Sequence, residues 1–585
     1  MISPRPSSRR LVAAPAAVAL LVASLLAGCG GSSGSSGTNA SPATVVPSSA
    51  PFYVDAVVAP EGSLKSDALS MGRTLTSRSQ PYMGLLKLLQ GPTGKTPSDS
   101  EVKPWLGENA GLFIGSISAS GASGAAGAAS GLLREALSKA LSEGFAGAES
   151  ALTGSSGSVA SLLGRGGVQG ALVLDTTDPS EARSFLEGQA HGAGAHTVSY
   201  KGTSFEVAPD GIAEGVVGRF AVIGSEAGVE GVIETHAGAA SLAQAAGYKQ
   251  LLSSAESGRL ANVYANLEGL SGALGASAGR EGSPLTLLAG LLGDAGQVYA
   301  SLIPSSSSVA VDVDTLPASG AARGGGTGTT GAQVLRGLPG NAWLALGFGD
   351  LGKTLGGGAA ALRSVGSLFS GLSLGSFSAG SVFAPLSSVP DVQRELLSWM
   401  GATGMYVGGS SLLNLQAAVI IDAKSPAPAR AAVGKLAAAY RAAGGSSSPT
   451  SVAGAEVAQN VRLSGFPLAL TLAYGEGKFI AGLGAASVKE ALHPQSTLEG
   501  SSAYSTAASA LGQGIEPSAL VEFHTMLGLM ESLSLTEVPS FSGIADALKP
   551  LDSMAVGGGK SLGGGVKRSR LTLSLSSGGG ETTSG

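Results

Sequence analysis

Apolar runs and helical patterns alternate along the chain, and the same alternation occurs twice. The runs ALVLDTT (171–177) and AAVIIDA (417–423) are short and rich in Val, Ile and Leu, which is typical of buried β-strands. Each leads through a proline into a helical pattern rich in Ala and Leu, at 178–190 and 425–440. Alternating polar–apolar strands and a second helix follow in both halves. Strands joined by hairpins, with helices on one face, predict an α+β fold of mainly antiparallel sheet.

Matching segments indicate that the two halves are homologous modules. PWLGENAGLFIGS resembles SWMGATGMYVGGS, and ALVLDTTDPSEAR resembles AVIIDAKSPAPAR. In the second pair of segments, the apolar run at the start of each segment ends in an aspartate. The elements also come in the same order in both halves. The matched residues include the pairs Trp105 and Trp399, Asp175 and Asp422, and Tyr248 and Tyr504.

The repeat sets the expected domain boundaries. Module one is predicted at 47–318 and module two at 334–577, each with a sheet covered by Ala/Leu-rich helices. The Gly-rich stretch 319–333 is typical of a flexible linker, and 578–585 is expected to be a disordered tail.

Module one also carries an insertion at about 118–167 that module two lacks. Within it, Leu133, Leu137, Leu141 and Phe145 fall at helical spacing, which predicts an amphipathic helix. Two interpretations stay open: a helix packed on its own module, or a lid, partner or membrane-surface helix. Module two has its own Gly/Ser/Phe-rich insert near 356–385, so each module is expected to carry one variable flap.

The N-terminus has the pattern of an export signal. A basic start is followed by an uncharged apolar run, Leu11–Gly28, which ends in Leu-Ala-Gly-Cys. That ending resembles the lipobox of bacterial lipoproteins, in which the cysteine becomes the lipid-bearing first residue. The resemblance implies a lipoprotein signal peptide at 1–28, with diacylglycerol and palmitate on Cys29. The uncharged Gly/Ser/Pro stretch 29–46 is expected to be a flexible tether.

Composition limits the remaining chemistry. The formal net charge is −5, and the sequence has no Lys/Arg cluster, so we expect no nucleic-acid partner. Cys29 is the single cysteine in the chain, which excludes disulfides, thiolate metal sites and a cysteine nucleophile outside the lipobox. The expected location is the outer face of the cytoplasmic membrane, where the protein is held by its N-terminal lipid.

Two motifs suggest catalysis, but glycine is abundant, with 92 residues, so chance matches are expected. GFGDLGKT (347–354) fits the phosphate-binding pattern, yet the matching segment of module one lacks it and the next residues are a poor helix start. GLSLG fits a hydrolase elbow with Ser373 as nucleophile, but no clear strand precedes it. Neither motif is taken as a site.

Other chemistry-bearing residues also have structural explanations. The histidines are expected to be solvated or hydrogen-bonded loop and helix-end residues, so no metal or other cofactor is predicted. Asp175 and Asp422 are expected in turns or at helix N-caps, and Trp105 and Trp399 in the core. The histidines are His191, His196, His236, His493 and His524.

These features together resemble a bacterial envelope family known as domain of unknown function 3352, common in actinobacteria and rich in lipoproteins. The resemblance rests on the lipobox, on ATVVPSSAPFYVDAVVAPEGSLKSDA, and on the SLAQAAGYKQLL and AVIIDAKSP segments. It implies no known activity and no site residues. The expected role is non-enzymatic binding or scaffolding in the envelope with a protein partner. Two alternatives remain: a carrier of a lipid or other apolar ligand, and an envelope hydrolase.

Overall fold

The computed structural model describes most of the two predicted modules in side-chain detail. The signal, most of the tether, the insertion at 118–167 and the tail lie outside the described residues. The described residues are 40–76, 89, 97–117, 168–274, 295–318, 330–350, 373–374, 377–378, 398–411, 413–462, 469–532, 545–546 and 548–576.

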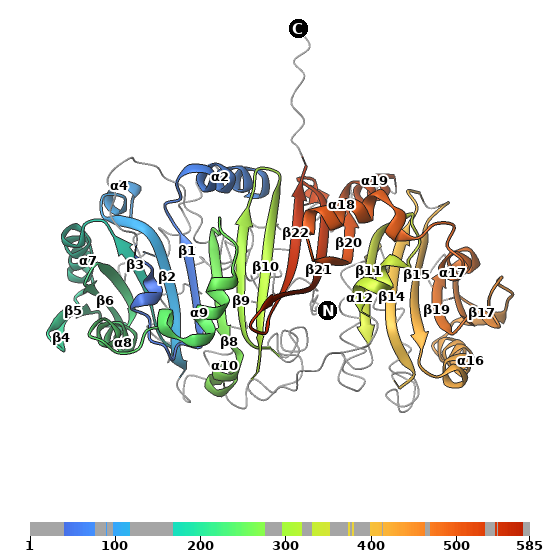
Figure 1. Ribbon diagram of the computed structural model, residues 1–585, viewed down its shortest axis with the longest axis horizontal. Coiled ribbons are helices and arrows are strands. Elements are labelled where there is room, and N and C mark those ends of the chain that lie inside the picture. The colour runs from blue at the N-terminus through green and yellow to red at the C-terminus, as the bar shows by residue number, and fades with distance from the viewer. Residues whose placement is uncertain are drawn as a thin grey trace, which may run out of the picture. The chain divides into compact units, whose positions relative to one another are not determined.

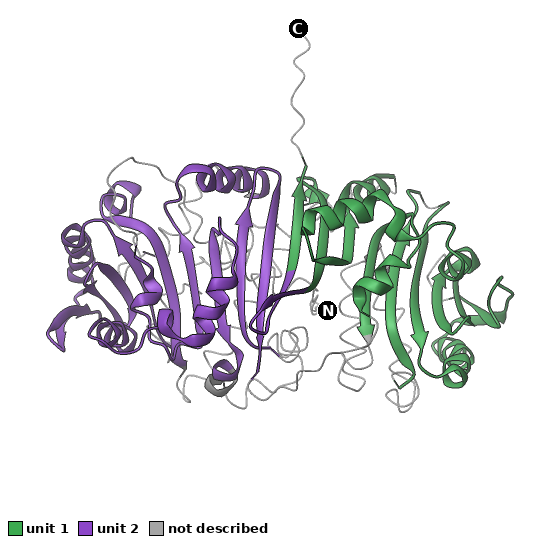
Figure 2. Ribbon diagram, in the orientation of Figure 1, with its two compact units in different colours: residues 1–13, 323–559, 570–585 green, residues 14–322, 560–569 purple. Residues whose placement is uncertain are grey.

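The chain divides into two compact units, shown in different colours in Figure 2. Unit 2 comprises 14–322 together with 560–569, and unit 1 comprises 323–559 together with 1–13 and 570–585. A short piece of the C-terminal strands therefore belongs to the unit that is otherwise built from the first half of the chain.

Unit 2 is built on an antiparallel sheet with the strand order β4-β5-β6-β7-β3-β2-β1-β8-β9-β10, and β22 (Val566–Leu575) pairs with β10. Its strands are β1 (Phe52–Val57), β2 (Leu106–Ile117), β3 (Val168–Thr176), β4 (His196–Tyr200), β5 (Thr203–Val207), β6 (Ile212–Val217), β7 (Phe220–Ser225), β8 (Ala261–Asn266), β9 (Ala295–Pro304) and β10 (Ser308–Pro317).

Helices cover both faces of this sheet (Figure 1). On one face the core includes Val229, Val232 and Ile233 of α8 and Tyr248 and Leu251 of α9. The opposite face of β6 and β7 is covered by α7. The helices are η1 (Pro42–Thr44), α2 (Gly62–Thr76), α4 (Asp99–Val102), α7 (Pro179–Ala193), α8 (Glu226–His236), η2 (Leu242–Gln244), α9 (Ala246–Ser254) and α10 (Leu267–Leu274).

Unit 1 has the strand order β16-β17-β18-β19-β15-β14-β11-β20-β21, again antiparallel. The helix α16 covers one face and α12, α17 and α18 the other. Its elements are α12 (Gly331–Arg336), β11 (Ala342–Asp350), β14 (Met400–Gly408), β15 (Gln416–Ala423), α16 (Pro426–Ala442), β16 (Ser446–Pro449), β17 (Val457–Arg462), β18 (Leu470–Gly475), β19 (Lys478–Leu483), α17 (Gly484–Leu492), η6 (Leu498–Gly500), α18 (Ser502–Leu511), β20 (Glu516–Glu522), α19 (Phe523–Ser532) and β21 (Leu551–Gly563).

The mainly antiparallel α+β architecture confirms the predicted fold class. Periodicity placed the strands β3 and β15 and the helices α7 and α16 correctly, because each combines an uninterrupted apolar pattern with a proline at the helix start. It missed β6, whose sequence IAEGVV contains a glutamate and a glycine that interrupt the strand pattern. One predicted linker residue, Thr330, is in fact the N-cap of α12, with its hydroxyl accepting from the N–H of Gln333.

The folded body begins earlier than the predicted end of the tether at residue 46. Ala43, Val45 and Val46 are buried in the core of unit 2, with Val46 fully inaccessible to solvent. Val46 also accepts a backbone hydrogen bond from Leu242 through its carbonyl oxygen. The uncharged Ser/Gly composition of the preceding residues masked these apolar positions, and the tether must end by Ala40.

Shortening Val46 should therefore destabilise unit 2, because a buried side chain would be cut back inside a packed core. We expect Val46→Ala to lower the free energy of unfolding by about 2 kcal/mol. Urea-dependent hydrogen exchange of the amides in β1 would measure this loss of stability. A change in the free energy of unfolding of less than about 0.5 kcal/mol is typical of a surface substitution. That result would show that residues 43–46 are part of the tether and not of the folded body.

No helix within the described residues is long and apolar enough to cross a membrane.

Candidate functional site

Unit 2 contains a layer of buried polar side chains on the face of its sheet that α9 covers. Strand register places them in two cross-strand rows, because residues directly opposite one another share a face. We call these residues the polar layer. The first row is Tyr53, Tyr264, Tyr299 and Asp314, and the second is Asp55, Asn262, Ser301 and Asp312.

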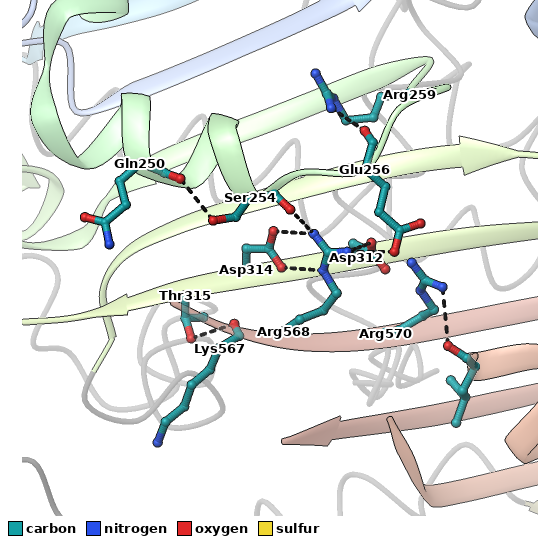
Figure 3. A network of polar contacts seen from close by, with 11 residues as sticks. Gln250, Ser254, Glu256, Arg259, Asp312, Asp314, Thr315, Lys567, Arg568 and Arg570 are labelled. Carbon is teal, nitrogen blue, oxygen red and sulfur yellow. Dashed lines mark hydrogen bonds and ion pairs between the residues drawn. The ribbon is translucent and has the colours of Figure 1, made fainter. Parts of the chain in front are cut away.

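Arg568 occupies the β10 end of the layer (Figure 3). Its Nε and Nη2 donate to Oδ1 and Oδ2 of Asp314, each at 2.8 Å, which is the two-pronged geometry that favours arginine over lysine. Its Nη1 lies 2.8 Å from Oε1 of Glu256 and 3.1 Å from Oδ2 of Asp312. Its Nη2 also donates to the carbonyl oxygen of Ser254 at 2.8 Å, at the end of α9.

The centre of this network is buried and contains more acids than bases. The side chain of Arg568 is 2% exposed, and those of Asp312 and Asp314 are each 1% exposed. Burial raises the pKa of Asp314 above its usual value, although its hydrogen bonds with Arg568 offset part of that rise. Burial opposes the charge on Arg568, but its bonds with Asp314 and the charge of Asp312 hold its pKa above the ordinary value. The arginine is therefore needed to keep these acids inside the fold.

Asp55 lies at the β1 end of the layer. Nδ2 of Asn262 donates to Oδ2 of Asp55 at 2.9 Å, while Oδ1 of each of these residues is buried without a hydrogen-bond partner in the described part of the chain. Burial raises the pKa of Asp55 to about 6, against the lowering effects of Asn262 and Arg259. This carboxyl therefore titrates close to neutral pH instead of near pH 4.

The tyrosines pack around Tyr248 of α9, which holds the helix on the sheet. Its ring lies edge-on to the rings of Tyr53, Tyr264 and Tyr299, with centroids 5.2–6.0 Å apart. Edge-to-face packing at this distance is favourable for aromatic rings. Burial raises the pKa of Tyr264 to about 12, so its phenol stays neutral.

The positions of unit 1 that correspond to Tyr53, Tyr264 and Tyr299 are apolar. The row opposite Tyr406 of β14 there consists of Ala345, Leu520 and Ala555, and Gly347 stands two residues from Ala345. The strand order around that row is the same as in unit 2. The strand order therefore does not require tyrosines in this row.

The geometry fits a structural role better than a catalytic one. A catalytic group must reach a substrate, whereas the charges of Arg568, Asp312 and Asp314 face one another inside the fold. In the described part of the chain, no group of three or more His, Cys, Asp or Glu residues is arranged to hold a metal ion.

The residues singled out by motif are not brought together. Cys29 lies outside the described residues. Residues 347–350 of the phosphate-binding pattern belong to β11, where Gly347 pairs with Gly404, and 351–354 lie outside the described residues. Ser373 lies in β12 (Ser373–Leu374), which pairs with β13 (Phe377–Ser378).

The histidines occupy separate local positions. Nδ1 of His191 lies 2.7 Å from the carbonyl oxygen of Glu187 within α7, and His196 begins β4. The other three are at or next to helix ends. His236 ends α8, His493 is the C-cap of α17 with Nε2 3.2 Å from Oε1 of Glu476, and His524 is the second residue of α19, with Nδ1 3.9 Å from Oδ1 of Asp552.

Of the repeated residues, the tryptophans behave as predicted and the aspartates do not serve as helix caps. Trp105 and Trp399 are 1% and 2% exposed. The N-cap of α7 is Asp178, which accepts from two backbone N–H groups, and not Asp175. Asp175 is instead buried in β3 with Nε of Arg219 2.8 Å from its Oδ1, because it still lies in the paired part of the strand.

The N-cap of α16 is likewise Ser425 and not Asp422. Asp422 is the next-to-last residue of β15, directly opposite Lys478 of β19. Burial raises the pKa of Asp422 above its usual value, and the Lys478 charge offsets part of that rise. Each of the two repeated aspartates is thus the next-to-last residue of its strand and lies beside a cationic residue.

Comparison with known proteins places most of the chain in one family. The model of the family described as "Protein of unknown function (DUF3352)" matches residues 11–556. The chain belongs to this family. This confirms the resemblance to domain of unknown function 3352, while the lipoprotein and actinobacterial character attached to it stays a prediction. DUF3352 membership extends across both units and assigns no activity to the polar layer.

Other comparisons add little. No curated protein matches the chain. A solved structure titled "Structure of crystal form I of TP0453" matches with 8% identity and a TM-score of 0.23, over 48% of this chain and 79% of that one. A likeness at that level does not bear on the fold or the function of this DUF3352 protein.

Proposed function

We propose that this DUF3352 protein is an exported lipoprotein, anchored through Cys29 to the outer face of the cytoplasmic membrane. The observation that carries the proposal is the short spacing between the Leu-Ala-Gly-Cys sequence at 26–29 and Ala40, which packs against the core of unit 2. Eleven residues at no more than about 3.6 Å each would keep the start of the body within about 40 Å of the membrane surface. The protein then works close to that surface.

The proposed role is non-enzymatic binding or scaffolding in the cell envelope. The buried charges of unit 2 support it, because Arg568 directs its contacts to groups of its own chain. We further propose that the two units are homologous modules. The shared strand order and the repeated tryptophans support that duplication, and divergence at the polar layer then assigned different tasks to the modules.

The anchor is tested by Cys29→Ser expressed in the native host. We expect wild-type protein in the membrane fraction with a diacylglycerol-bearing cysteine by mass spectrometry, and the variant in the soluble extracellular fraction. A matched Ser32→Ala variant in the tether should behave as wild type. Membrane retention of Cys29→Ser with an uncleaved N-terminus would overturn the lipid anchor and favour a signal anchor.

The soluble Cys29→Ser form also separates scaffold from carrier. The segments expected to act as flaps, 118–167 and 356–385, lie mostly outside the described residues, so the carrier remains an alternative. Native mass spectrometry of this form should give the bare polypeptide mass if the protein is a scaffold. An added mass that survives desalting would identify a carried ligand instead.

A further inference from the structure

A second buried acid, Glu214, lies at the interface between α7 and the sheet of unit 2. It is central in β6 and is only 3% exposed. Its neighbours Ala213 and Val217 belong to the core formed with α8. Alternation along the strand therefore directs Glu214 to the opposite face, where α7 packs. Its Oε1 is buried without a hydrogen-bond partner among the described residues.

The groups around Glu214 do not compensate its charge. The residue directly opposite it in β5 is Glu206, and on its other side in β7 is Ile223. Asp210, in the turn between β5 and β6, adds a further negative charge. Like charges directly opposite in a sheet destabilise it.

α7 brings no buried cation to this face. Its inward residues include Ala182, Leu186 and Ala190. Gln189 is half-buried, and its Oε1, like that of Glu214, lacks a hydrogen-bond partner in the described part of the chain. The charged and titratable residues of α7 are exposed; they are Glu181, Arg183, Glu187 and His191.

Unit 1 shows what the fold itself requires at this position. In the strand order that both units share, β18 of unit 1 corresponds to β6 of unit 2. Leu472 of β18 is the counterpart of Glu214, because it lies opposite Ala481 of β19 and Gln459 of β17. Glu214 lies in the same way opposite Ile223 and Glu206. Leu472 is 2% exposed and packs in one core with residues of α16 such as Val433 and Leu436. A leucine therefore fills the site in one unit and an acid in the other.

We propose that Glu214 is a proton-operated latch for α7: in its neutral form the helix is seated on the sheet, and ionisation against Glu206 loosens it. Unit 1, with Leu472 in this place, lacks the latch. The proposal does not depend on the lipid anchor or on the scaffold role.

The direction of the response follows from linkage. Burial and the charges of Asp210 and Glu206 raise the pKa of Glu214 from 4.5 to about 7. A raised pKa means that the seated state binds the proton more tightly than the opened state, so seating is firmest at low pH and weakens as pH rises through about 7. With an opened-state value of 4.5, the opening equilibrium should grow about thirtyfold between pH 5.5 and pH 8.5.

The test is hydrogen-exchange mass spectrometry on the full chain at pH 5.5, 7.0 and 8.5, with each rate corrected for intrinsic exchange. Protection of the α7 amides should fall about thirtyfold across this range, and protection of α16 in unit 1 should not change. Glu214→Gln and Glu214→Leu should both abolish the pH dependence of α7. Glu206→Gln should reduce it, because only the opposing charge is removed.

Two results would overturn the latch. One is α7 protection that does not change with pH in the wild type. The other is a Glu214→Gln variant that keeps the wild-type pH profile, which would assign the response to another group. If Glu214→Leu fails to fold, the glutamine variant still decides, since it has the same shape as the neutral acid.

Discussion

Replacement of Arg568 by methionine should lower the free energy of unfolding of unit 2 by about 3–5 kcal/mol. The substitution keeps most of the side-chain volume but leaves Asp312 and Asp314 buried without their cation. Both carboxyls are 1% exposed, so water cannot take over the role of the guanidinium. The contacts to Glu256 and to the end of α9 would be lost at the same time.

Because the chain has two units, a single melting temperature would mix their stabilities. Urea-dependent hydrogen exchange should be followed separately in β9 of unit 2 and in β18 of unit 1. We expect the loss in β9 and no change in β18. Lys567→Met, one residue away on the exposed side of β22, is the matched control and should change stability by less than about 0.5 kcal/mol.

A second variant distinguishes a lost ion network from a lost side chain. Combining Arg568→Met with Asp314→Leu and Asp312→Leu removes the orphaned acids, so most of the stability should return. If the triple variant is as unstable as Arg568→Met, the arginine would act through packing and not through charge.

The fold was largely predictable because its signal is local. Apolar runs of strand length and a proline at the helix start identify β3, α7, β15 and α16 without reference to the rest of the chain. The failures occurred where tertiary context overrides that signal. The apolar residues at 43–46 are hidden in a polar stretch, and β6 contains an acid that only the neighbouring strands can bury.

The polar layer was not predictable in the same way. A partial signal exists, since YVD (53–55), NVY (262–264) and VDVD (311–314) place polar residues two apart inside apolar strands. The pattern shows that these side chains share a face, but not that the face is buried. Nor does it indicate the cation, because Arg568 lies 254 residues from Asp314 along the chain. Local periodicity cannot pair residues at that separation.

Replacing Glu214 with leucine should stabilise unit 2, which is unusual for a core substitution. Burial raises the pKa of Glu214 from 4.5 to about 7. This rise means that the folded state disfavours the ionised carboxylate, relative to the neutral acid, by about 3 kcal/mol. Because the pKa is raised in the folded state, the contribution of Glu214 to stability is full below pH 4.5 and is lost as pH rises through about 7. We therefore expect Glu214→Leu to gain about 2–3 kcal/mol at pH 8.5 and about 1 kcal/mol or less at pH 5.

The same measurement has a reciprocal control within the chain. Leu472→Glu places an acid at the corresponding position of unit 1 and should make the stability of that unit fall with rising pH, as unit 2 does in the wild type. Urea-dependent exchange in β7 and β19 reads the two units in one experiment. Should Glu214→Leu destabilise β7 equally at both pH values, the carboxylate would be serving as a hydrogen-bonding member of the core. The pH dependence separates these cases because a packing defect does not titrate.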